Sequence, residues 1–296
     1  RREVILSGGA INSPQLLMLS GIGDASHLKN VGIEPIVDAK AVGRNLQDHI
    51  AVSYFYKVRT ATLNDVLHPF VGKIRAGLRY MADRAGPLSL SVNQSGGFVR
   101  SDATKKHPNL QLYFSPVSYT KTPLSERKLL NPDPFSAFLL SHNPCRPTSR
   151  GHIELACADP AKYPVIHPNY LATQADIDDV LAGNRLLKQI ARTKPLADII
   201  TEELIPGAHV DGDEALLADF RARADTVYHP TSTCMMGPDA ATSVVDVRLR
   251  VHGVDGLRVI DASVFPTITS GNTNAPTVMV AEKGAAMILE DAKSMR

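Results

Sequence analysis

The chain has 296 residues, of which 44% are hydrophobic and 21% charged, a balance typical of a globular protein with one large or two modest cores. Its net charge of +2 gives no reason to expect nucleic acid or an anionic membrane as a partner. No apolar run reaches the roughly 18 residues of a transmembrane segment. The three widely spaced cysteines, Cys145, Cys157 and Cys234, match neither a disulfide framework nor a CxxC metal site, and they favour a reducing, cytoplasmic compartment.

The first elements expected form an α/β unit. A short buried strand over Glu3–Ala10 ends in glycines, and Ser13 and Pro14 then start a helix as N-cap and first helical residue. The run Ser20–Gly23 stops that helix. Because the chain opens with Arg1, without Met and next to an apolar run, we expect it to be the C-terminal part of a longer protein or a processed chain.

From about residue 50 the pattern changes to mostly strand. Leu110–Ser115 and Gly151–Leu155 alternate as half-buried strands of an antiparallel sheet do, with loops such as Asn131–Pro134 between them. Thr173–Asp176 predicts a helix start of the capping-box type, and Asp213–Arg223 predicts a second helix. The apolar positions of the first of these helices are Ile177, Val180, Leu181, Leu187 and Ile190.

The C-terminal part returns to alternating strand and helix. Leu257–Ile260 predicts a strand, followed at once by Asp261, Ala262 and Ser263. Asn274–Thr277 opens the last helix. Its expected apolar side consists of Val278, Ala281, Ala285 and Ile288. The fold class expected is therefore α/β at both ends, with a middle part of strands and helices.

His229 stands in the sequence YHPTSTCMMG, among small, hydroxylated and sulfur-bearing residues. A metal site needs two or three further ligands, and only Cys234 lies near it, so no metal is predicted. A serine hydrolase needs a G-x-S-x-G elbow, and Ser20 lacks the leading glycine. The residues alone leave open whether His229 is held in a polar core or faces a ligand.

A second stretch, Ser270–Thr277, places two asparagines, a glycine and a proline before the last helix. A helix N-terminus presents unpaired N–H groups and partial positive charge, which stabilise an anion. Asn274 can also serve as an ordinary N-cap, and the two interpretations do not exclude each other.

Three stretches together resemble the glucose-methanol-choline (GMC) family of flavin-dependent alcohol oxidases and dehydrogenases. Gly9–Gly23 is similar to the family's second signature, and Val42–His49 is similar to its VGxNLxDH segment. The run from Tyr228 to about Ile288 resembles the family's catalytic end. The resemblance implies a GMC-type flavoprotein fragment, part of a Rossmann-like FAD-binding domain plus an antiparallel-sheet substrate domain.

The same resemblance implies domain boundaries and a partner. Residues 1–50 and 228–296 would belong to the FAD-binding domain, and residues 51–227 to the substrate-binding domain. Family members hold the ADP part of FAD with a G-x-G-x-x-G turn, which occurs nowhere in this sequence. We therefore expect the chain to need a missing N-terminal FAD-binding segment.

The resemblance also implies site residues. His229 matches the catalytic base that takes the alcohol proton while hydride passes to the flavin, and Asn272 matches its partner at the substrate oxygen. Asp261 and Ala262 match a backbone contact to FAD, and Ala10 matches a position near the adenosine. The helix start at Thr273, Asn274 and Ala275 would face the flavin.

The remaining conspicuous residues receive structural interpretations. Asp48 and His49 are expected to fasten a loop between domains, and Arg150 a turn. Expected packing residues are Cys234, Met235 and Met236. Three other histidines are expected to lie on the surface or to be hydrogen-bonded within the core, namely His142, His152 and His167.

The function predicted is FAD-dependent oxidation of a neutral aliphatic or aryl alcohol. Choline is disfavoured because a quaternary ammonium ion calls for aromatic residues and a carboxylate, whereas the chain lacks Trp and is 5% aromatic. Tyr228 and Gln94 are the predicted substrate contacts, and Gln94 stands where choline-oxidising members carry Glu. The alternatives are a choline dehydrogenase-like enzyme, a non-catalytic remnant without flavin, and a serine hydrolase.

Overall fold

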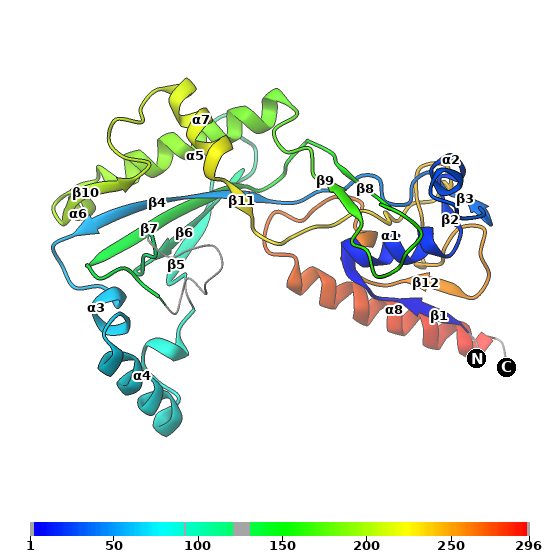
Figure 1. Ribbon diagram of the computed structural model, residues 1–296, viewed down its shortest axis with the longest axis horizontal. Coiled ribbons are helices and arrows are strands. Elements are labelled where there is room, and N and C mark those ends of the chain that lie inside the picture. Colours follow the sequence, from blue (N-terminus) through cyan, green and yellow to red (C-terminus); the bar gives the residue numbers. More distant parts are fainter. Residues whose placement is uncertain (1–2, 92, 121–130, 295–296) are drawn as a thin grey trace. The chain divides into compact units, whose positions relative to one another are not determined.

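The computed structural model describes residues 3–91, 93–120 and 131–294, which divide into two compact units (Figure 1). Unit 1 comprises residues 1–49, 146–176 and 226–296, and unit 2 comprises residues 50–145 and 177–225. Residues 146–176 thus group with the two ends of the chain, although the sequence suggested a continuous middle domain. The reason is backbone pairing, since Leu46 and Gly151 exchange hydrogen bonds and the Ile153 N–H donates to the Gly43 carbonyl.

The described residues of unit 1 form three two-stranded sheets, of which β1–β12 and β2–β3 are parallel and β8–β9 is antiparallel. Its elements are β1 (Val4–Leu6), α1 (Gly9–Leu19), β2 (Ile22–Gly23), α2 (Ala25–Asn30), β3 (Val37–Asp38), β8 (His152–Glu154), β9 (Val165–His167), β12 (Leu257–Val259), the 3₁₀ helix η3 (Ala262–Val264) and α8 (Asn274–Ser294). One apolar core joins them, with Leu17, Leu28, Ile153 and Val259 almost fully buried.

Unit 2 is built on an antiparallel sheet of order β10–β4–β7–β6–β5. Its elements are β4 (Ile50–Val58), α3 (Leu63–Leu67), α4 (Phe70–Asp83), the 3₁₀ helix η1 (Pro87–Ser89), β5 (Ser95–Val99), β6 (Leu110–Ser115), β7 (Ala137–Pro144), α5 (Gln174–Ala191, in unit 2 from Ile177), α6 (Lys194–Ala197), β10 (Ile200–Ile205) and α7 (Asp213–Arg223). The short strand β11 (Asp225–Thr226) follows α7 in the chain. The predicted strand Leu110–Ser115 and helix Asp213–Arg223 are confirmed.

Helix α1 begins five residues earlier than the sequence predicted, so Ser13 and Pro14 lie inside it rather than at its start. A proline inside a helix has no N–H for the carbonyl four residues before it, which here belongs to Ala10. The Thr233 hydroxyl fills that place and donates to the Ala10 carbonyl over 2.6 Å. Ser13, predicted as N-cap, instead donates its hydroxyl to the Asp261 carboxylate over 2.6 Å.

Two predicted apolar faces are wrong in part, because Leu6 and Ile288 pack against the core of unit 1 as expected but other positions do not. Strand β1 was expected to be buried, yet Val4 and Ile5 are 53% and 44% exposed, because β12 is its one strand partner among the described residues. In α8 the buried positions are Val280 and Gly284, while Val278 is 53% exposed. A Cβ on Gly284 would come within 2.8 Å of the Ile260 side chain. Because glycine has no Cβ, this face of α8 can pack closely against the core.

The start of α5 uses half of the predicted capping box. The Thr173 hydroxyl accepts the Asp176 N–H over 3.3 Å. The Asp176 carboxylate accepts the backbone N–H groups of Thr148 and Ser149 over 2.7 and 2.8 Å. The acid therefore ties the helix start to the turn before β8. Among the described residues, no helix is both long and apolar enough to cross a lipid bilayer.

The bond from Thr233 to Ala10 gives a stability prediction. Thr233→Val keeps the side-chain shape but leaves the buried Ala10 carbonyl unpaired, which is expected to cost about 1–3 kcal/mol. Urea unfolding of the chain followed by circular dichroism measures the change. Thr233→Ser keeps the hydroxyl and serves as the control, so equal losses in the two variants would contradict the assignment.

Candidate active site around His229

The loop that carries His229 is held by pairing with a segment far away in the sequence. Gln47 and Thr231 exchange backbone hydrogen bonds, and the Val227 N–H donates to the His49 carbonyl over 3.2 Å. Thr231 is fully buried. This pairing of the two loops brings Asp48 and His49 against the His229 ring.

The imidazole of His229 has a partner on each nitrogen and is 9% exposed. Its Nδ1 lies 3.0 Å from Nδ1 of His49, with the two rings edge to face at a centroid distance of 5.3 Å. Its Nε2 lies 3.1 Å from Nδ2 of Asn272. An amide nitrogen only donates, so Nε2 of neutral His229 carries a lone pair and Nδ1 carries the proton that points at His49.

Asp48 holds this arrangement from the backbone side. Its carboxylate accepts the His229 N–H over 2.9 Å, and it also accepts hydroxyl groups from Thr226 and Tyr170. Burial lowers the pKa of His229 below the usual 6.5, and the negative charge of Asp48 opposes that shift. His229 is therefore neutral and able to accept a proton at neutral pH.

Asp261 ties the start of the chain to its C-terminal part. Its carboxylate accepts the N–H of Gly9 over 2.9 Å, the hydroxyl of Ser13 over 2.6 Å and the N–H of Ser263 over 2.7 Å. The side chain is thus occupied inside the protein. The backbone N–H groups of Asp261 and Ala262, in contrast, have no hydrogen-bond acceptor within the described part of the chain.

The beginning of α8 lies directly after Asn272. Thr273 is 8% exposed, whereas Asn274 and Ala275 are exposed, and the first turn contains no acidic residue. The first N–H groups of a helix have no acceptor within the helix, so this end carries partial positive charge. The arrangement suits an anionic or carbonyl-bearing ligand.

The structure brings some of the predicted residues together and not others. His229 and Asn272 are in contact, and the Ala262 carbonyl accepts the Ser232 N–H over 3.2 Å. Ala10 is 4% exposed and its carbonyl is used by Thr233. Tyr228 is 78% exposed with a φ of 60°, in the left-handed region.

Gln94 belongs to unit 2, where its side-chain amide donates to the Ser91 carbonyl over 2.9 Å. Among the residues predicted to be structural, Cys234 is fully buried, and Arg150 donates to the carbonyls of Pro147 and Ser149 within its own turn.

His49 is the residue whose position the sequence interpretation missed. It was expected to fasten a loop, yet its ring contacts the ring of His229 directly and is 1% exposed. The signal in the sequence was its place after Gln47 and Asp48, a run of hydrogen-bonding side chains. The structure buries these residues, and buried polar groups need partners. Nothing in the local pattern indicates a partner 180 residues away.

Comparison with known proteins identifies the family. Two sequence models described as GMC oxidoreductase match residues 1–51 and 147–281, together more than half of the chain. The chain belongs to the GMC oxidoreductase family. The matched segments include every residue of the His229 site described above.

Curated relatives of this GMC chain include a choline dehydrogenase and an alcohol dehydrogenase. Human mitochondrial choline dehydrogenase is 42% identical over 293 residues, 97% of this chain and 48% of the relative. An alcohol dehydrogenase [acceptor] from Pseudomonas putida is 42% identical over 288 residues, 97% of this chain and 51% of the relative. The chain spans about half the length of these curated relatives.

Solved structures agree with the GMC fold. A formate oxidase variant from Aspergillus oryzae, described in connection with FAD modification, matches with a TM-score of 0.89 and 29% identity over all of this chain and 55% of its own. A fungal aryl-alcohol oxidase matches with a TM-score of 0.82 and 26% identity, covering 98% of this chain and 55% of its own. The predicted α/β flavoprotein fold is confirmed.

FAD is the cofactor of this GMC family, and the residues present fit part of it. The N–H groups of Asp261 and Ala262, free of acceptors among the described residues, and the start of α8 offer donors to phosphate and to the flavin carbonyl edge. The G-x-G-x-x-G turn that binds the pyrophosphate of a dinucleotide does not occur in the 296 residues.

The contacts of His229 predict its protonation state. ¹⁵N NMR of the imidazole is expected to find the Nδ1–H tautomer, with a pKa below 6.5. Asp48→Asn is expected to lower that pKa further, because the lost negative charge had favoured the imidazolium. Glu34→Gln, at an exposed acid, should leave it unchanged.

His49→Ala removes the acceptor of the Nδ1 proton, so the Nε2–H form is expected to appear in the same spectra. A His229 pKa that rises in Asp48→Asn, or a tautomer indifferent to His49→Ala, would contradict the geometry.

Proposed function

We propose that this chain carries the catalytic base of an FAD-dependent enzyme that oxidises an alcohol to an aldehyde or ketone. The observation that supports this most strongly is the contact of His229 Nε2 with Asn272 Nδ2, 3.1 Å apart, beside the start of α8. One basic nitrogen and one amide donor then share a position that a substrate hydroxyl can enter.

His229 acts in this proposal as a general base. The lone pair on Nε2 accepts the hydroxyl proton, and the pKa lowered by burial keeps the ring neutral and ready before substrate binds. The amide of Asn272 donates a hydrogen bond to the same oxygen as negative charge develops on it. FAD, when bound, supplies the oxidant for the alcohol carbon.

His49 acts as a positioning residue. By accepting the Nδ1 proton of His229 it keeps the lone pair on Nε2, the nitrogen beside Asn272. When Nε2 gains a proton, the Nδ1–H bond to His49 becomes charge-assisted and stabilises the imidazolium. Asp48, bonded to the His229 backbone, adds a favourable negative charge.

The proposed substrate is a neutral aliphatic or aryl alcohol. Gln94 supplies no charge to pair with a quaternary ammonium ion, and Tyr228 is the aromatic residue that directly precedes the base in the sequence. Choline is the second candidate, because the human relative named choline dehydrogenase is 42% identical, the same value as for the P. putida alcohol dehydrogenase.

The serine hydrolase alternative has less support. Among the described residues no serine hydroxyl hydrogen-bonds to the His229 ring, whose partners are His49 and Asn272. Ser20, the serine considered from the sequence, is the C-cap of α1.

The proposal is tested on the FAD-bound protein by rapid-mixing kinetics of flavin reduction. His229→Ala is expected to slow reduction by about 10²–10⁴-fold, the usual size of general-base catalysis. Asn272→Ala is expected to cost about 10²–10³-fold, as for one lost oxyanion donor.

His107→Ala, at an exposed histidine in unit 2, serves as the control and is expected to reduce flavin at the wild-type rate. An unchanged rate in His229→Ala would overturn the assignment of the base. If the protein binds FAD but none of the alcohols tested reduces the bound flavin, the non-catalytic alternative is supported.

The substrate is tested by comparing kcat/KM for choline with a panel of neutral aliphatic and aryl alcohols. The best neutral alcohol is expected to exceed choline, because Gln94 offers hydrogen bonds but no charge. A preference for choline of about tenfold or more, equivalent to 1.4 kcal/mol, would show that Gln94 does not decide selectivity.

A further inference from the structure

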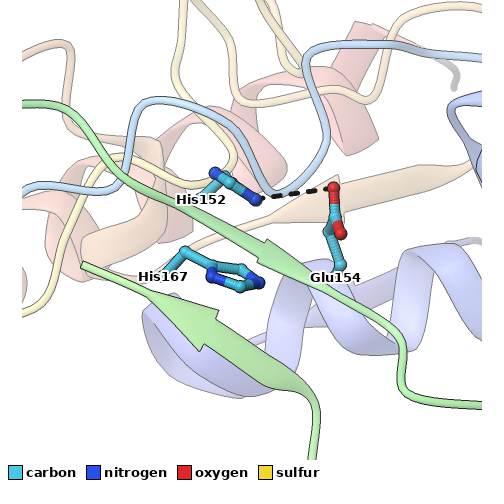
Figure 2. Close-up of side chains that lie close together, drawn as sticks. All are labelled: His152, Glu154 and His167. Carbon is cyan, nitrogen blue, oxygen red and sulfur yellow. Dashed lines mark ion pairs between the residues drawn. The ribbon is translucent and has the colours of Figure 1, made fainter. Parts of the chain in front are cut away.

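The β8–β9 hairpin of unit 1 gathers two histidines and a glutamate on one side. His152 and Glu154 are two residues apart on β8, so their side chains point to the same face. His167 on β9 stands directly opposite His152 in the antiparallel register. Figure 2 shows the three side chains converging from the two strands.

The distances within this cluster suit a metal ion. One ligand atom from each of the three residues lies within 4.8 Å of the others, and His152 Nε2 is 3.5 Å from Glu154 Oε1. Tetrahedral zinc with bonds of about 2.0–2.1 Å separates its ligand atoms by about 3.3 Å. Small side-chain rotations therefore bring all three atoms into ligand positions.

The two histidine rings of the cluster lie against each other. The two imidazoles stack with centroids 4.5 Å apart. Within the described chain the His167 ring makes no hydrogen bond, so its nitrogens are available.

Arg44 is the one cation that pairs with the cluster among the described residues. Its guanidinium lies 3.2 Å from Glu154 Oε1, and its side chain is 44% exposed. Exposed ion pairs contribute about 0–1 kcal/mol, so a metal ion can displace this one at little cost. Arg44 is therefore a competitor for Glu154 rather than a permanent partner.

We propose that His152, His167 and Glu154 form a binding site for one divalent transition-metal ion of the nickel, copper and zinc class. Two imidazoles and one carboxylate favour these ions over magnesium and calcium, which prefer oxygen ligands alone. Three protein ligands leave one tetrahedral position to water. The site clips β8 to β9 and involves none of the residues around His229.

The site is tested by calorimetric titration of zinc chloride into the chain, produced without a histidine tag. Saturable binding at one site is expected for zinc, and none for magnesium chloride at the same concentrations. Bound zinc is also expected to raise the unfolding temperature, because it binds the folded hairpin.

Substitutions separate this site from general histidine binding. His152→Ala and His167→Ala are each expected to weaken zinc binding by at least about tenfold, since even outer partners of a metal are worth about 10–100-fold. His107→Ala, an exposed histidine outside the cluster, is the control and should bind zinc as the wild type does.

Arg44→Ala gives a result of opposite sign. Removal of the competing cation is expected to tighten zinc binding by about 1.5- to 5-fold, the value of an exposed ion pair. Weaker binding in this variant would overturn the assignment of Glu154 as a ligand. The proposal as a whole fails if zinc does not bind saturably, or if His152→Ala/His167→Ala, folded by circular dichroism, binds it with wild-type affinity.

Discussion

The site around His229 depends on the backbone pairing between the loop at Gln47 and the loop at Thr231. Two reciprocal N–H···O=C bonds fix their register, so Asp48 and His49 meet the His229 backbone and ring in one orientation. A shift by one residue would turn these side chains to the opposite face. The tautomer, the lowered pKa and the contact with Asn272 all follow from this alignment.

Part of the fold could be predicted from local sequence alone. The strand Leu110–Ser115 and the helix Asp213–Arg223 were found with correct ends, although no side chain caps the start of the helix. The start of α1 was misplaced because Pro14 is normally read as a first-turn residue. The helix tolerates Pro14 because the Thr233 hydroxyl donates to the carbonyl that the proline leaves unpaired. Thr233 lies more than 200 residues later, so no local pattern reveals this bond.

The site could also be predicted only in part, because some of its contacts join segments that are far apart in the sequence. His229 and Asn272 were identified through the family resemblance, and their contact is present in the structure. His49, His152 and His167 were assigned ordinary structural places because each stands alone in the sequence. Their partners come from other strands and loops, and tertiary pairing alone makes an isolated histidine part of a cluster.

The bonds of Asp261 to Gly9 and Ser13 span 252 and 248 residues of chain. During synthesis, the carboxylate that anchors α1 does not exist until all of unit 2 has been made. Contacts of this range close very long loops, and loop closure must be completed before such bonds can stabilise anything. Helix α1 is therefore made early within this stretch of chain but is among the last of its parts to acquire all of its native bonds.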